Sequence, residues 1–334
     1  MNISKIWNRN ILMAVFIGLL YVIFSNLSFM VSAFLGATTL FVLLKKSQKL
    51  LVIKKRWNPY LAIVFLMLVS LFLIVLPFYF VAVYLINNTV PLVNNPEPLI
   101  KAFNTVDNYL GSNYNIYVLN EDISLKLLSF LNKILPKILN SGLSIVSNLV
   151  LLYFILWFML LKAKKMEIWV KNNLPMGLRD SVHLLQIINK QIFSNAIGVY
   201  LLAIVQALFA ILGYWIFGFN EPVVWGCITG VASVIPIIGT MVVWVPLAIY
   251  SIAIGNFTAG IGLALYGLII VGSSDNIFRF ILQKKLASTH PLITIIGVFF
   301  GLNFLGFWGL IFGPVLLVLL IEIYYMLKKR SQWE

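Results

Sequence analysis

The sequence predicts an all-α polytopic membrane protein that combines scaffold spans with an inverted repeat of a span and a re-entrant helical hairpin. Hydrophobic residues make up 61% of the 334-residue chain and charged residues only 10%. A soluble domain carries roughly 25% charged residues, so this chain lacks the polar side chains that a water-facing surface needs. Several uncharged runs also reach the roughly 20 residues that a helix needs to cross the hydrocarbon of a bilayer. Two of these runs are interrupted by proline and glycine.

The net charge of +14 arises from 24 basic and 10 acidic residues. Because basic residues collect in the cytoplasmic loops of membrane proteins, we interpret this excess as an orientation signal and expect no nucleic-acid partner. The single cysteine, Cys227, excludes an intrachain disulfide. One cysteine and two histidines do not provide a zinc cage, and no metal or other cofactor is expected.

The first half of the chain predicts four spans with basic segments between them. The uncharged run 10–44 is interrupted near its middle by Asn26 and Ser28, which favours two short antiparallel helices. Basic residues cluster at 45–56 and again at 162–190, and the charge rule places both clusters and the amino terminus in the cytoplasm. The expected divisions are three spans in 1–86, an extracytoplasmic amphipathic segment in 87–145, and a fourth span with a cytoplasmic connecting helix in 146–193.

Residues 194–334 are expected to form a transport domain with two helical hairpins, 223–256 and 291–321. Each of these segments is too long for one span, and proline and glycine interrupt its middle. If both crossed the membrane once, Lys284 and Lys285 would face outward, against the charge rule. If both are re-entrant, these lysines and the carboxyl terminus lie in the cytoplasm, so that both termini are cytoplasmic.

The spans 194–217 and 257–281 each precede one hairpin, and the two pairs are predicted to enter from opposite faces. Such paired, interrupted segments are typical of the substrate site of a secondary transporter. A broken helix exposes backbone N–H and C=O groups, which persist at membrane depth only where protein or a water-filled cavity receives them. The candidates for substrate binding are small and polar residues at these breaks and on the neighbouring spans: Ser233, Pro236, Gly239, Thr240, Asn276, Asn303, Gly306 and Gln206.

Several of these candidates also have a purely structural interpretation. The hydroxyls of Ser233 and Thr240 can bond the backbone of their own helix. The amide of Gln206 can bond a neighbouring helix.

Asp275 is the one acidic residue in the apolar stretch 223–321. An ionisable side chain inside a membrane is costly, which makes Asp275 and its neighbour Arg279 candidates for ion coupling. Arg279 lies one helical turn later, so a structural ion pair between the two is the alternative. A proton or sodium role would require the carboxylate to meet each side of the membrane in turn.

Four groups of residues occur in the order and spacing of a known family: Ile235–Gly239, Asp275–Asn276, His290–Pro291, and the glycine run from Gly301 to Gly313. On these residues the sequence resembles the autoinducer-2 exporter family of bacterial membrane proteins. Phe280 stands where that family usually has a proline. The resemblance implies eight hydrophobic segments and a homopentamer in the bacterial inner membrane. It also implies two hairpins that hold substrate and move as an elevator against the first four spans.

The hypothesis from sequence is therefore a secondary transporter that exports a small polar metabolite, such as autoinducer-2, by elevator-type alternating access. A cation (sodium)/proton antiporter, in which Asp275 would be decisive, is one alternative. A non-transporting membrane scaffold is another. An enzyme is not expected, because the sequence holds no Ser/His/Asp arrangement, metal cluster or nucleotide-binding motif. The expected partners are the metabolite or ion and membrane lipid.

Overall fold

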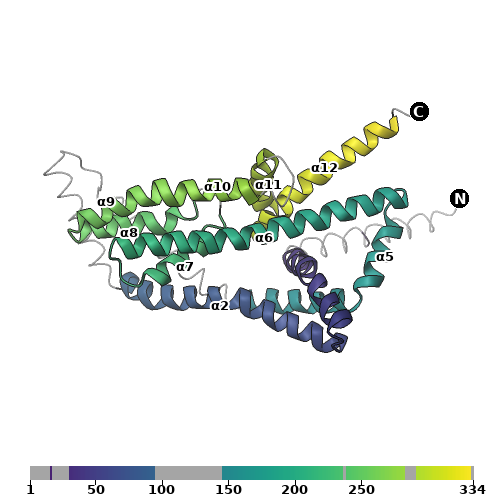
Figure 1. Cartoon of the computed structure of the whole chain (residues 1–334), viewed down its shortest axis with the longest axis horizontal. Coiled ribbons are helices and arrows are strands. Elements are labelled where there is room, and N and C mark those ends of the chain that lie inside the picture. Colours follow the sequence, from purple (N-terminus) through teal and green to yellow (C-terminus); the bar gives the residue numbers. More distant parts are fainter. Residues whose placement is uncertain (1–15, 17–29, 95–144, 236–237, 283–290, 332–334) are drawn as a thin grey trace, which may run out of the picture. The chain divides into compact units, whose positions relative to one another are not determined.

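The structure, a computed structural model, describes residues 16, 30–94, 145–235, 238–282 and 291–331 (Figure 1). All regular elements in these ranges are helices. By length and composition, five of the described helices can cross a membrane, or six if the bent pair Ile145–Leu161 and Ala163–Asn173 forms one span. The prediction of an all-α polytopic membrane protein is thus confirmed.

Contacts divide the chain into two compact units. Unit 1 comprises residues 1–66, 143–192 and 292–334, and unit 2 comprises residues 67–142 and 193–291. The predicted boundary at residue 194 separates the expected transport domain, 194–334, from the spans before it. It concerns which parts of the molecule move together during transport, and it stays a prediction. The predicted amphipathic segment 87–145 lies outside the described residues for almost all of its length.

Unit 1 begins with the helix Met30–Lys54, whose last turn, η1 (Leu50–Lys54), is π-helical. The helix therefore continues through most of the basic cluster that follows residue 44. It is followed by α2 (Pro59–Asn94), which begins in this unit. Lys45 of the first helix forms an ion pair with Glu167 of α5 (Ala163–Asn173). This pair joins α5 to the first helix, because the two charges are far apart in sequence and meet only in the fold.

The helix Ile145–Leu161 and α5 meet at an angle of 85°. The next helix, α6 (Leu178–Ile216), has 39 residues and begins in unit 1. The predicted connecting helix and the predicted span at 194–217 are therefore one continuous helix. A helix of this length extends about 58 Å, almost twice the thickness of the hydrocarbon core, so part of α6 must project beyond it.

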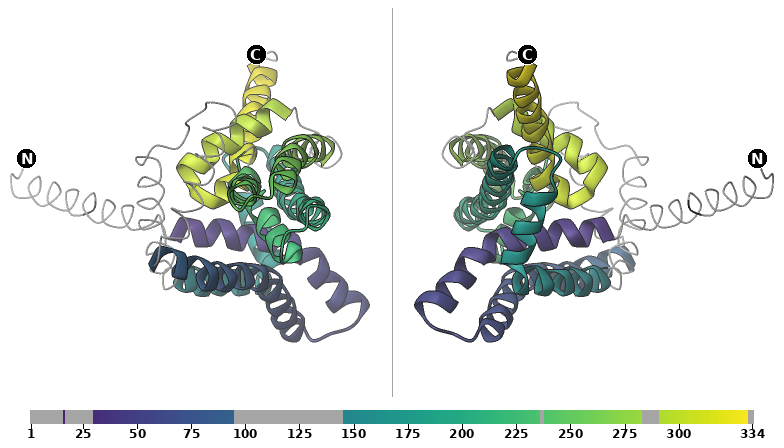
Figure 2. Two further views of the ribbon diagram at one scale, coloured as in Figure 1. Left: turned by 90° about the vertical axis from the view of Figure 1, so that its left-hand side faces the viewer. Right: turned by 90° about the vertical axis from the view of Figure 1, so that its right-hand side faces the viewer.

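Near the end of the chain, α11 (Pro291–Leu305), the short 3₁₀ helix η4 (Gly306–Trp308) and α12 (Gly309–Ser331) fold back on one another (Figures 1 and 2). A Cβ atom on Gly301 would lie 2.7 Å from the Gly313 Cα and would overlap the Gly309 carbonyl oxygen. The two helices thus pack backbone against backbone. The chain reverses at Gly306, which has a φ of +59° that favours glycine.

Two further contacts fix this hairpin within unit 1. Trp308, at the turn, packs against Gly36, where an added Cβ would lie 2.5 Å from the indole Cζ2. His183 Nε2 of α6 lies 3.0 Å from Glu322 Oε1 of α12. The histidine therefore has a partner on α12, although more than half of its side chain remains exposed.

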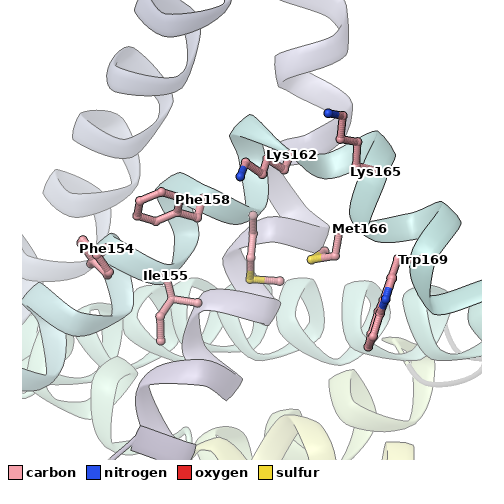
Figure 3. A pocket seen from close by; sticks show the side chains of 8 residues that line it. Phe154, Ile155, Phe158, Lys162, Lys165, Met166 and Trp169 are labelled. Carbon is pink, nitrogen blue, oxygen red and sulfur yellow. The ribbon is translucent and has the colours of Figure 1, made fainter. Parts of the chain in front are cut away.

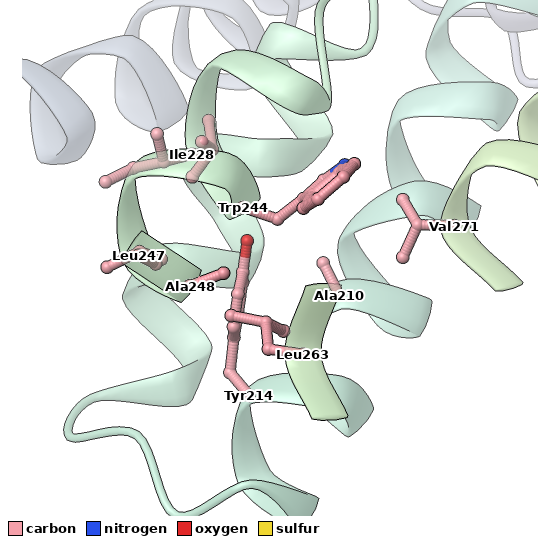
Figure 4. Packing of buried hydrophobic residues seen from close by; sticks show 9 residues of the cluster. Ala210, Tyr214, Ile228, Trp244, Leu247, Ala248, Leu263 and Val271 are labelled. Carbon is pink, nitrogen blue, oxygen red and sulfur yellow. The ribbon is translucent and has the colours of Figure 1, made fainter. Parts of the chain in front are cut away.

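Unit 2 contains the rest of α6 together with α7 (Pro222–Ala232), α8 (Met241–Ala253), α9 (Phe257–Tyr266), the π-helical turn η2 (Gly267–Val271) and α10 (Gly272–Leu282). The last three form one continuous helix. It packs antiparallel to α6: Gly213 meets Tyr266 at one level, and Gln206 meets Val271 at another. Residues of α6, α7, α8, α9 and η2 share one buried cluster (Figure 4): Ala210, Tyr214, Ile228, Val243, Trp244, Leu247, Ala248, Leu263 and Val271.

Glycine allows α7 to approach α6 closely. A Cβ on Gly230 would lie 2.6 Å from the Ala203 carbonyl oxygen, so only glycine permits this spacing. At the residue before Gly230, Thr229 Oγ1 forms a buried hydrogen bond of 2.8 Å with the Tyr214 hydroxyl of α6. With 11 and 13 residues, α7 and α8 extend about 16 and 20 Å, and neither can cross a hydrocarbon core of about 30 Å by itself.

Candidate functional site

The turn between α7 and α8 holds three of the predicted site residues, Ser233, Gly239 and Thr240. Ser233 and Thr240 are buried, and Ser233 Oγ donates a hydrogen bond of 2.7 Å to the Gly230 carbonyl oxygen. A Cβ on Gly239 would overlap the Ala232 carbonyl oxygen at the end of α7. The glycine is thus required by the close approach of the turn's own backbone. This turn shapes the hairpin tip, and the Ser233 hydroxyl bonds its own helix.

Gln206 lies at the centre of a polar cluster in an otherwise apolar part of unit 2. Its side chain is 0% exposed. Its Nε2 donates to the Val271 carbonyl oxygen and to Ser274 Oγ, at 3.3 Å each. Ser274 Oγ donates in turn to the Val271 carbonyl oxygen at 2.9 Å. We call Gln206, Val271 and Ser274 the amide cluster.

The other end of the Gln206 amide has no partner in the part of the chain that the structure describes: Oε1 is buried and accepts no hydrogen bond there. A buried acceptor without a donor costs about 1–3 kcal/mol relative to one that is bonded. A hydroxyl or other N–H or O–H group placed beside Oε1 would remove this cost. The atom therefore marks a position where a polar guest is favoured.

Trp244 borders the same π-helical turn from α8. Its indole extends from α8 toward Val271 (Figure 4), and it packs on Gly267, where an added Cβ would lie 2.5 Å from the ring carbon Cδ2. The residue is 6% exposed, and its buried Nε1–H has no acceptor among the residues that are described. Trp244 of α8, with an unbonded donor, thus lies against the start of η2 at Gly267. Gln206 of α6, with an unbonded acceptor, lies against its end at Val271. A polyol carries both donors and acceptors and could satisfy both.

Asp275 follows Ser274 in the first turn of α10 and is 6% exposed. The structure buries this side chain within the protein, next in sequence to the amide cluster. A buried acid at this depth is a candidate for proton or sodium coupling.

The remaining candidates lie elsewhere or are not described. Asn303 and Gly306 are exposed residues at the turn of the α11–α12 hairpin, which belongs to unit 1. Pro236 and the side chains of Asn276 and Arg279 lie outside the described residues. In the described ranges, no group of three His, Cys, Asp or Glu side chains could hold a metal ion.

Sequence reasoning missed three members of this site: Ser274, Trp244 and the Val271 carbonyl oxygen. For Ser274 a signal was present, because Ser273, Ser274, Asp275 and Asn276 are consecutive polar residues within an apolar run. Trp244 resembled an ordinary packing residue. The carbonyl oxygen gives no signal in a sequence, because its role depends on the π-helical turn.

A family model described as AI-2E family transporter matches residues 11–329, almost the whole chain. The chain is also similar to curated proteins that bear the name "Putative transport protein". One from Aquifex aeolicus is 25% identical over 222 residues, which cover 64% of this chain and 63% of the relative. One from Helicobacter pylori strain J99 is 26% identical over 63% of this chain and 62% of the relative. One from Methanocaldococcus jannaschii is 27% identical over 70% of this chain and 74% of the relative. The matches thus span a little under two thirds of the first two relatives.

Proposed function

This chain belongs to the AI-2E family of transporters, and from that premise we propose that it is a secondary transporter that exports a small polar metabolite, such as autoinducer-2. The class of protein rests on the family. The cargo, the direction and the elevator mechanism are our proposal. In the same way we propose that it is a homopentamer of a bacterial inner membrane with both termini in the cytoplasm.

The observation that carries the proposal is the unsatisfied carbonyl oxygen of Gln206. The side chain is 0% exposed, its Nε2 is fixed by two hydrogen bonds, and its Oε1 has no donor among the described residues. Asn148 Oδ1 in unit 1 is also without a donor in those ranges, but Gln206 differs because a second such atom, Trp244 Nε1, belongs to a side chain that packs against the same π-helical turn. The amide cluster therefore supports a site for a hydroxyl-bearing cargo.

Broken helices surround this site, as a transporter's substrate site requires. The α7–α8 hairpin contributes Trp244, and η2 interrupts the regular α-helix between α9 and α10. We propose that the α7–α8 hairpin is re-entrant and that Thr240 and Asn276 complete the site in unit 2. Contact of Asn303 and Gly306 of unit 1 with the cargo is a separate proposal, which rests on the sequence. Alternating access then consists of an elevator movement of the hairpins against the first four spans, during which the contact between Trp308 and Gly36 has to break.

Efflux from liposomes tests this proposal. The purified protein is reconstituted into liposomes loaded with autoinducer-2, and its release is compared between the unmodified protein and Gln206→Leu. We expect release at least tenfold slower for Gln206→Leu, because a leucine offers no acceptor to the cargo. The matched control is Asn189→Leu on the same helix, whose side-chain Nδ2 donates to the Leu185 carbonyl oxygen and which lies outside the amide cluster, and it should export normally. Equal release by all three proteins would exclude Gln206 from the site. No release above protein-free liposomes by the unmodified protein would favour another cargo or the scaffold.

Cation/proton exchange is a second candidate, favoured by one observation, the burial of Asp275. A carboxylate that alternates between the charged and the protonated state can exchange a cation for a proton. The two functions are compatible if the ion drives export of the metabolite.

A further inference from the structure

An open groove of about 540 Å³ lies in unit 1, where the helix Ile145–Leu161 meets α5. It takes no part in the proposed transport site. The side chains that line it are Phe154, Ile155, Phe158, Met159, Lys162, Lys165, Met166 and Trp169. Figure 3 shows the phenylalanines on the span, Trp169 on α5, and the two lysines near the 85° bend between the helices.

The groove has two chemically different parts. Along the span its wall is apolar, and Phe154 and Phe158 are 60% and 45% exposed, so the described residues of unit 1 leave this wall largely uncovered. At the bend, Lys162 and Lys165 supply positive charge. From Phe154 to Lys162 the chain rises about 12 Å. The groove is apolar at the Phe154 end and positively charged at the Lys162 end, so it suits a long molecule with an apolar tail and an anionic head.

The positive charge at the bend is not balanced by its own helix. Glu167 is the one acidic residue of α5, and it forms its ion pair with Lys45 of the helix Met30–Lys54. The lysines of the groove therefore keep an excess of positive charge near the end of a span. Basic pockets at the ends of membrane spans are suited to acidic lipid headgroups.

We infer that this groove binds one anionic phospholipid, with its acyl chain along Phe154 and Phe158 and its phosphate between Lys162 and Lys165. A second copy of the chain is a poorer occupant. Its surface would have to supply acidic residues opposite the two lysines, and the chain has only 10 acidic residues against 24 basic ones. A lipid phosphate supplies that charge, and membrane lipid surrounds the span.

Native mass spectrometry of the full-length protein in a neutral detergent tests the inference. The protein is titrated with dioleoyl phosphatidylglycerol, which is anionic, or with dioleoyl phosphatidylcholine, which has no net charge. We expect the first lipid to bind at least tenfold more tightly. Lys162→Gln with Lys165→Gln should weaken phosphatidylglycerol binding about 10- to 25-fold, since each lysine contributes about fivefold near an anionic headgroup. Binding of phosphatidylcholine should change less than twofold.

Lys164→Gln with Lys171→Gln is the matched control, because it removes the same charge from α5 at positions outside the groove. It should weaken phosphatidylglycerol binding less than threefold, and Lys162→Arg with Lys165→Arg should retain it. The arginine variant also separates loss of charge from loss of fold. Replacement of Phe154 and Phe158 by glutamine should weaken the binding of both lipids, because the acyl chain loses its apolar wall.

Three outcomes would overturn the inference. Equal weakening by the groove pair and the control pair would show only the effect of net charge. Displacement of the lipid by millimolar glycerol phosphate would assign the lysines to a soluble phosphate. Loss of oligomers in the groove variant without loss of bound lipid would assign the groove to a second copy. None of these outcomes depends on the proposed cargo, because no step of the test measures transport.

Discussion

The side-chain amide of Gln206 donates a hydrogen bond to the Val271 carbonyl oxygen across 3.3 Å and joins α6 to the end of the π-helical turn η2. Single π-helical turns within α-helices are frequent at functional sites, because they change the direction of backbone groups at a defined point. Here the turn separates α9 from α10 and presents its last carbonyl oxygen to two side chains, Gln206 and Ser274. The amide cluster is therefore both a joint between helices and the centre of the proposed site.

Removing both donors to the Val271 carbonyl oxygen should destabilise unit 2. We expect Gln206→Leu combined with Ser274→Ala to lower the free energy of unfolding by about 1 kcal/mol, because the loss of both side-chain hydrogen bonds to a buried carbonyl oxygen is partly offset by removal of the unbonded Gln206 Oε1. Each single variant should cost less than half of that, because the other donor remains. Thermal unfolding of the purified variants measures the effect. Ser181→Ala is the control, since its hydroxyl bonds a Gly177 carbonyl oxygen that already accepts the Ser181 N–H. Strict additivity of the two single effects would contradict a shared acceptor.

The glycine contact between α11 and α12 should not tolerate a side chain. We expect Gly309→Ala to lower the free energy of unfolding by about 1–3 kcal/mol, the range for overpacking. Its Cβ would overlap the Gly301 carbonyl oxygen, which is a backbone atom and cannot move aside as a flexible side chain can. Gly198→Ala on α6 is the control, as a Cβ there meets nothing within 4 Å. In a helix interior that change should stabilise by about 0.5–1 kcal/mol. We expect the melting temperature to fall for Gly309→Ala and to rise for Gly198→Ala, relative to the unmodified protein. Similar shifts for both variants would contradict the close packing of α11 on α12.

Asp275→Asn tests the second candidate function. If Asp275 exchanges a proton for a cation, the asparagine variant should lose pH-driven sodium uptake into liposomes, because an amide does not titrate in this range. Asp180→Asn, an acid in the first turn of α6, should keep full activity. Sodium uptake by Asp275→Asn at the rate of the unmodified protein would exclude exchange through this residue.

The sequence predicted the spans and the positions of their breaks because both depend on local composition. Uncharged runs predict membrane helices, and the proline and glycine residues at 233–240 and 301–313 mark where α7 and α11 give way to a turn. The continuity of α6 was not predicted, because the change from charged to apolar residues at 193 was interpreted as the end of a helix. Charge alone does not end a helix, and no proline lies between Leu178 and Ile216.

The geometry of the site could be predicted only in part. Gln206 was identified because a lone amide in an apolar span requires a partner. Its partners come from residues 65 and 68 positions later, and only the fold brings them together. The π-helical turn was also not predictable, since the segment Gly267–Val271 has the composition of any apolar helix. Likewise, the neighbour of Gly239 is a carbonyl oxygen of its own turn, which a sequence does not indicate.

Labelling of cysteines at the two ends of the α7–α8 hairpin tests the central claim, that this segment enters and leaves the membrane on the same side. Asn220→Cys and Ile254→Cys are placed singly in a Cys227→Ser background, at exposed positions before α7 and after α8. Intact cells and inverted vesicles are then treated with a membrane-impermeant maleimide. We predict that both positions react from outside the cell and that neither reacts from the cytoplasmic side. Reaction of the two cysteines from opposite sides would show that the segment crosses the membrane, and the proposed site between re-entrant hairpins would then be wrong.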